Sequence, residues 1–276
     1  MNDNTQEILN RVYASLKSQV EFSPKVLLTL GSGLGDVVEN MQVEKIVNYG
    51  DIEGMPVSTV RGHKGRFLFG YIKDVPVAVM QGRIHYYEGY TPQQCVLPAR
   101  LIGLMGAKVF FATNVSGGIT YPEKGTLMRI TDHISLIPSP LRGNNIAELG
   151  VRFPDMTKAY DEELGAIVDD VANKHNIDLK KGVYIQMQGP NFETAGEVRM
   201  AKILGADVVG MSTAIEVIAA RHMGLKVIGL TCVVNPACGV TNERLDNVVE
   251  EDAFRISGDK IKTLVFESIA KIGEIL

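Results

Sequence analysis

The feature that most constrains the fold is a set of strand-like segments that are apolar along nearly their whole length. Three of them, residues 24–30, 108–114 and 226–235, are separated by amphipathic helical segments with short connections. A strand without polar alternation is covered on both faces, as when helices pack on each side of a parallel or mixed sheet. We therefore expect an α/β fold with a central mixed sheet flanked by helices.

Length and composition favour one cytoplasmic domain. The chain has 276 residues, is 45% hydrophobic, and contains no repeat and no linker rich in Pro, Gly or Ser, which predicts a single domain over residues 1–276. A net charge of −4 argues against a nucleic-acid partner. No apolar run approaches the roughly 20 residues of a membrane span, so we expect no membrane partner. The three cysteines lack CxxC spacing, which is typical of buried thiols in a reducing compartment.

Periodicity and turn residues predict the remaining elements. Lys73-Asp74 is expected to turn a hairpin between two strands. Residues 116–118 are expected to form a glycine turn, and residues 138–157 a long loop. The predicted strands are 66–72, 75–83, 126–137, 182–189 and 207–212, and the predicted helices are 5–20, 92–107, 159–176, 194–206, 214–224 and 249–273.

The glycine-rich turn after the first strand is suited to an oxyanion. In α/β folds, ligands bind at the carboxyl ends of strands, and the first strand ends in Gly31-Ser32-Gly33. The dinucleotide spacing G-x-G-x-x-G fails because Asp36 occupies its sixth position, and no phosphate-loop motif is present. A hydroxyl beside free backbone N–H groups, at a possible helix start, can still bind phosphate. The alternative is a turn required only for packing.

Arg83 and His85 strengthen the phosphate interpretation. Their i, i+2 spacing places both on one side of an extended segment, and the arginine fork matches phosphate oxygens. Each alone could be structural, as a surface ion pair or a buried imidazole. Ser32 and Ser212 at other strand ends make a shared anion site the better hypothesis.

A second group of residues points to a planar, hydrogen-bonding ligand such as guanine or hypoxanthine. Phe192 offers a stacking face, Glu193 can accept from N–H donors, and Asn235 can both donate and accept. The alternative for Glu193 is a carboxylate that stabilises the N-terminus of the following helix. The histidines have no metal-ligand spacing and the cysteines are scattered, so we predict no metal.

Together these segments resemble a known enzyme family. LGSGLG, RGHKG, QGRIHYYEGY, GPNFETAGEVRM and GADVVGMSTAIEVIAARH occur in the order and spacing of the trimeric, low-molecular-mass purine nucleoside phosphorylases, from about Pro24 to the C-terminal helix. The resemblance implies a single domain with a distorted mixed sheet and a homotrimer with sites near subunit interfaces. It also implies reversible phosphorolysis of 6-oxopurine ribonucleosides and deoxyribonucleosides. Phosphate is then a co-substrate, and no cofactor is needed.

The resemblance also assigns roles to individual residues. The implied catalytic residues are His85, Glu193 and Asn235. The implied phosphate-binding residues are Ser32, His63, Arg83, His85, Ser116 and Ser212. The implied nucleoside-binding residues are Tyr87, Val115, Tyr184, Phe192, Glu193, Met211, Asn235 and Asn247.

Two positions depart from the family pattern and leave the substrate preference open. Val234 stands where the family has a threonine beside the base, and Asn247 where a histidine usually meets the ribose 5′-hydroxyl. A phosphorylase that prefers xanthosine or 5′-modified nucleosides is therefore an alternative. Two further alternatives are a nucleoside hydrolase, which would leave Ser32, Arg83 and His85 unexplained, and a non-catalytic nucleoside- or phosphate-binding protein.

Overall fold

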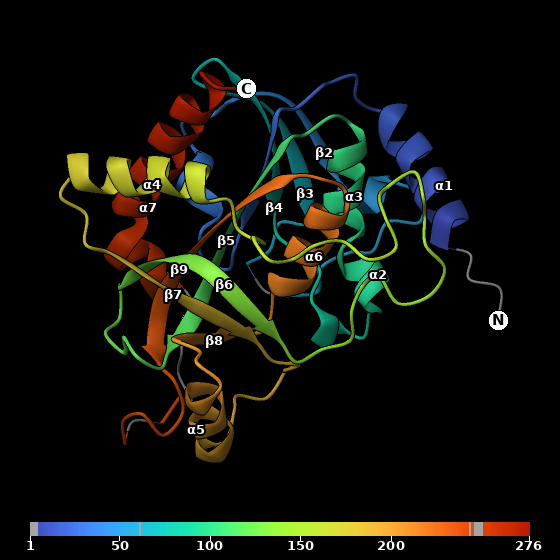
Figure 1. The fold of residues 1–276 in the computed structure, drawn as a ribbon. Coiled ribbons are helices and arrows are strands. Elements are labelled where there is room, and N and C mark those ends of the chain that lie inside the picture. The colour runs from blue at the N-terminus through green and yellow to red at the C-terminus, as the bar shows by residue number, and fades with distance from the viewer. Residues whose placement is uncertain (1–4, 61, 243, 246–250) are drawn as a thin grey trace.

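The protein is described by a computed structural model that covers residues 5–60, 62–242, 244–245 and 251–276 (Figure 1). Within these residues, nine strands form one mixed sheet in the order β2-β3-β4-β1-β5-β8-β7-β6-β9. Their bounds are β1 Val26–Leu30, β2 Gln42–Asn48, β3 Arg66–Ile72, β4 Val75–Gln81, β5 Val109–Gly118, β6 Leu127–Ser135, β7 Leu179–Gln186, β8 Val208–Gly210 and β9 Lys226–Pro236. The predicted α/β class with a mixed sheet is confirmed.

Half of the sheet closes on itself. Strand β9 pairs with β6 on one side and, in parallel, with β5 on the other, so β5, β8, β7, β6 and β9 form a ring. The other half is an open extension in which β1 lies between β4 and β5, parallel to both. As a result, β1, β4, β5 and β9 run in the same direction, and their carboxyl ends meet at one edge of the sheet.

Helices cover the two faces of the sheet in two groups. The helices are α1 Thr5–Lys17, α2 Pro92–Cys95, α3 Leu97–Leu104, α4 Glu162–Lys174, α5 Ala195–Ile203, α6 Ala214–His222 and α7 Glu251–Gly273. Helices α1, α3 and α6 pack on one face, and α4 and α7 on the other (Figure 1). This double cover explains why all five residues of β1 are buried. No helix among the described residues is long and apolar enough to cross a membrane.

Several predicted elements need correction. The single helix expected over residues 92–107 is two helices that meet at Val96, since Pro98 has no N–H to donate and its ring clashes with the carbonyl four residues earlier. The glycine turn expected at residues 116–118 is the last part of β5, which pairs there with β8 and β9. Strand β2 was missed because it is exposed along nearly its whole length and shows no apolar alternation.

Candidate active site

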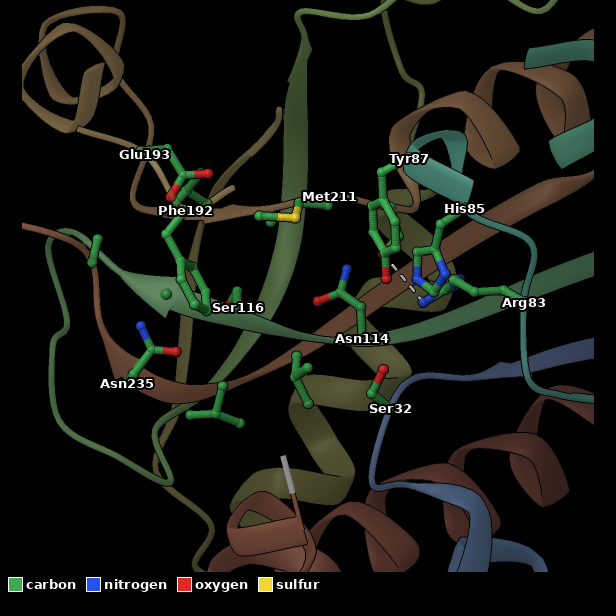
Figure 2. Close-up of a pocket in the computed structure, with 17 residues that line it drawn as sticks. Ser32, Arg83, His85, Tyr87, Asn114, Ser116, Phe192, Glu193, Met211 and Asn235 are labelled. Carbon is green, nitrogen blue, oxygen red and sulfur yellow. Dashed lines mark hydrogen bonds between the residues drawn. The ribbon is translucent and has the colours of Figure 1, made fainter. Parts of the chain in front are cut away.

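A cavity opens at the edge where the parallel strands end, and most of the predicted site residues line it (Figure 2). Those on its wall are Ser32, Arg83, His85, Tyr87, Val115, Ser116, Phe192, Glu193, Met211, Ser212 and Asn235. In Figure 2, Ser32, Arg83 and His85 lie at one end, and Phe192, Glu193 and Asn235 at the other. Met211 and Asn114 lie between the two groups, and Tyr87 lies beside His85.

Arg83 is held rigidly in the wall of the cavity. It follows β4 and its side chain is almost fully buried. Its Nη1 donates to the carbonyl of Thr113, at 3.0 Å, and to the hydroxyl of Ser212, at 3.3 Å. Its Nη2 lies 3.0 Å from Oε2 of Glu216, close enough for an ion pair although the N–H bond is not aligned as a hydrogen bond. The guanidinium thus has a fixed orientation before any ligand binds.

Ser32 is supported from behind by His63. The Oγ of Ser32 lies 3.0 Å from Nε2 of His63, whose Nδ1 lies 3.2 Å from the amide nitrogen of Arg83. Burial and the neighbouring charge of His85 lower the pKa of His63 to about 4, so the ring is neutral near pH 7. The same Nδ1 also lies 3.2 Å from the carbonyl oxygen of Arg83, so it accepts from the amide in one tautomer and donates to the carbonyl in the other. In the tautomer with its proton on Nε2, His63 donates to Ser32, and the Ser32 hydroxyl proton can point into the cavity.

The turn that carries Ser32 is smaller than a helix start. It runs through Gly31-Ser32-Gly33 into a 3-10 helix of four residues, Gly35–Val38. The α-helix N-terminus suggested by the sequence is therefore absent at this turn. Gly31 is required because a Cβ there would lie 2.7 Å from the Asn114 backbone on the neighbouring strand. This close approach brings Ser32 beside the end of β5.

His85 lies in a stack of three rings. Its ring centroid is 5.1 Å from that of His63 and 4.7 Å from that of Tyr87. Its Nδ1 is 3.2 Å from Oε1 of Glu88. Burial works against ionisation of Glu88, but hydrogen bonds from His85 and Thr59 outweigh it and lower its pKa to about 2. The charged Glu88 thereby orients the imidazole, leaving the other ring nitrogen for a ligand.

The opposite end of the cavity holds a carboxylate with one unpartnered oxygen. Glu193 is 8% exposed, and its Oε1 has no hydrogen-bond partner among the described residues. Burial raises its pKa above the usual value for glutamate. The helix-capping role weighed for it belongs to Glu197, whose side chain accepts from the amide of Thr194 at the start of α5. Glu193 is therefore free to receive a hydrogen-bond donor from a ligand.

Two residues beside Glu193 complete that end. Asn235 is buried at the end of β9, and one hydrogen of its Nδ2 is donated to the carbonyl of Pro236 at 2.7 Å. Its remaining amide groups are on the cavity side (Figure 2). Phe192 is 47% exposed, and its ring lies in the cavity wall between Glu193 and Ser116 (Figure 2). This combination can bind a planar ring through one face and one polar edge.

Three predicted residues do not line the cavity, and the hydroxyl of a fourth is turned away from it. His63 is not part of the cavity wall and contacts Ser32 from behind. Tyr184 is fully buried, and its hydroxyl accepts from the Ser212 amide at 3.2 Å, so it supports the wall from behind. The Oγ of Ser116 pairs with Thr231 at 2.7 Å. Asn247 lies outside the described residues.

The structure also shows functional positions that the sequence analysis did not select. Asn114 lines the cavity, and its Nδ2 donates to Oγ1 of Thr213 at 2.8 Å. Glu216 is the ion-pair partner of Arg83. The available signals were an amide at the end of an apolar strand and a carboxylate in the apolar first half of a predicted helix. No group of three or more potential metal ligands occurs among the described residues.

Comparison with known proteins agrees with this geometry. Residues 25–270 match the model of the phosphorylase superfamily. The chain is 42% identical to purine nucleoside phosphorylase 1 of Bacillus subtilis, over 88% of this chain and 91% of that protein. This chain belongs to the purine nucleoside phosphorylase family. The mouse purine nucleoside phosphorylase is 40% identical over 85% of this chain and 83% of its own length.

Solved structures of family members share the fold. The Schistosoma mansoni purine nucleoside phosphorylase in complex with inosine is 30% identical with a TM-score of 0.86, covering 95% of both chains. A purine nucleoside phosphorylase in complex with ribose-1-phosphate is 32% identical with a TM-score of 0.84, covering 95% of this chain and 96% of its own. The family predicted from the sequence is confirmed.

Proposed function

We propose that this protein catalyses the reversible phosphorolysis of 6-oxopurine ribonucleosides and deoxyribonucleosides, releasing free base and (deoxy)ribose 1-phosphate. The observation that carries the proposal is a single cavity with polar and cationic groups suited to an oxyanion at one end and a buried carboxylate with one unpartnered oxygen at the other. A homotrimeric assembly and a cytoplasmic location are proposed with it, on the family resemblance. Inorganic phosphate is the co-substrate, and the reaction as proposed uses no further cofactor.

The phosphate is proposed to bind between Ser32, Arg83, His85 and Ser212. The arginine supplies a fixed positive charge and the two hydroxyls supply neutral donors, with the His85 imidazole beside them. Holding the phosphate next to C1′ of the ribose converts a bimolecular encounter into an intramolecular one, which can lower the barrier by several kcal/mol, up to roughly 7–11. The ribose would lie between the two ends, against Tyr87 and Met211.

The base is proposed to bind at the other end. The Oε1 of Glu193 can accept the N1–H of a 6-oxopurine, and the free N–H of Asn235 can donate to the ring edge that gains negative charge. As the C1′–N9 bond breaks, its electron pair moves to the purine and the sugar becomes an oxocarbenium ion. A phosphate oxygen then forms the new bond to C1′. Hydrogen bonds to the developing purine anion strengthen in the transition state and so raise the rate.

The decisive experiment is base release from a nucleoside panel with and without phosphate. We expect inosine and guanosine to be cleaved only when phosphate is present, with ribose 1-phosphate as the second product. Equal release in phosphate-free buffer would instead identify a hydrolase. Binding without turnover would identify a binding protein.

The panel should also include xanthosine, 5′-deoxyinosine and adenosine. Adenosine is needed because the Schistosoma mansoni relative, 31% identical to this chain, has been solved in complex with it. A site that requires N1–H should discriminate against adenosine, by up to roughly four orders of magnitude. Comparable rates for adenosine and inosine would show that Glu193 has been given the wrong role.

A further inference from the structure

We propose that Glu216 is a positioning residue of the phosphate site, which orients the Arg83 guanidinium from the side away from the ligand. The inference rests on the proposed function, because it assumes that Arg83 binds phosphate. Its basis is the placement of the two side chains. Each is 2% exposed, and among the described residues neither forms another ion pair.

The anchors of Arg83 come from three separate elements. Glu216 faces Nε and Nη2 from the first turn of α6, with distances of 3.5 Å to Oε1 and 3.0 Å to Oε2. The carbonyl of Thr113 on β5 and the hydroxyl of Ser212 after β8 hold Nη1. Only Glu216 among these anchors carries a charge. A two-atom contact of this kind restrains rotation of the planar guanidinium, which a single acceptor does not.

Glu216 sits on the opposite side of Arg83 from the ligand. Arg83 lines the cavity, whereas Glu216 does not. The carboxylate therefore balances the buried positive charge without occupying the surface that a phosphate would meet. Replacing a buried ion pair by apolar residues is often neutral or stabilising. The pair is therefore better explained by the orientation of Arg83 than by stability alone.

The turn before α6 ties Glu216 to a second phosphate-facing group. Ser212 and Glu216 belong to one segment and contact different nitrogens of Arg83. Between them Thr213 has φ 81° and ψ −55°, a backbone conformation that residues with a side chain rarely adopt. The Asn114 side chain holds this turn through Thr213 Oγ1. This geometry lets one short segment place both the hydroxyl and the carboxylate around the guanidinium.

The test is Glu216→Gln, which keeps the side-chain size but removes the charge and turns an NH₂ group toward Arg83. We expect the KM for phosphate to rise about tenfold. The KM for inosine should stay within about twofold, and kcat at saturating phosphate within about threefold. The matched control is Asp169→Asn, which removes a carboxylate that pairs with Arg129 and Lys181 and does not line the cavity. It should lower the melting temperature without changing either KM.

Two further measurements keep the result interpretable. The first is the increase in melting temperature that inorganic phosphate alone produces in the wild type and in the Glu216 variants. It needs no turnover, so it tests the inference independently of the proposed reaction. Glu216→Asp keeps the charge on a shorter stem and should raise the KM for phosphate only about threefold, even if Glu216→Gln does not fold. An unchanged or lowered KM for phosphate in either variant would overturn the proposal. Equal increases in both KM values would assign Glu216 a purely structural role and overturn it as well.

Discussion

Arg83→Met should destabilise the protein as well as weaken phosphate binding. The substitution leaves Glu216 in the core without its only ion-pair partner among the described residues. An uncompensated buried charge of this kind costs about 3–5 kcal/mol. At roughly 2–4 °C per kcal/mol for a chain near this size, the melting temperature should fall by about 10 °C. Thermal unfolding in phosphate-free buffer measures this loss of stability without any contribution from bound phosphate.

A double variant separates stability from function. Arg83→Met with Glu216→Met replaces the pair by two apolar side chains, so most of the lost stability should return. Phosphate-dependent turnover should not return, because the guanidinium is gone. Arg129→Met is the matched control, since its partner Asp169 is partly exposed and keeps Lys181 as a second ion-pair partner at 2.8 Å, so the loss should be smaller. A single variant as stable as the wild type, or a double variant no more stable than the single, would refute the reasoning.

Three further predictions follow from the other polar groups. Glu193 must be ionised to accept N1–H, and burial raises its pKa. The kcat/KM for inosine should therefore fall on acidification at a pH above the usual glutamate range. The same fall at acid pH in Glu193→Gln would contradict this. The pKa of His63 is lowered from 6.5 to about 4 in the folded protein, so the unfolded chain binds a proton more readily. The stability that is present above pH 6.5 should therefore be lost as the pH falls from 6.5 to 4. In His63→Gln the loss of unfolding free energy between pH 7 and pH 5 should be about 1–3 kcal/mol smaller than in the wild type, as measured by urea unfolding. The same pH dependence in both proteins would rule out His63 as the source of the loss. Asn247→Ala should slow only nucleosides with a 5′-hydroxyl, by about tenfold at most, whereas a lower melting temperature with unchanged kinetics would indicate a helix cap.

The sequence by itself determined the fold class and the family. Apolar strands such as Val26–Leu30 alternate with amphipathic helices, and this local pattern records burial on both faces of a sheet. The order and spacing of the motifs around Ser32, Arg83 and Glu193 carried the resemblance to the family. Their positions after strands predicted one shared site, since the carboxyl ends of parallel strands meet at one edge. These features are local in the chain, so they can be read without coordinates.

Only the tertiary structure decided how distant residues combine. The closure of β9 onto β5, the exposed strand Gln42–Asn48 and the position of Tyr184 behind Ser212 depend on pairings that leave no local pattern. Arg83 and Glu216 are 133 residues apart in the chain, yet they share one buried ion pair. Periodicity shows that a side chain is covered, but not what covers it, because the partner is selected by the packing of the whole domain.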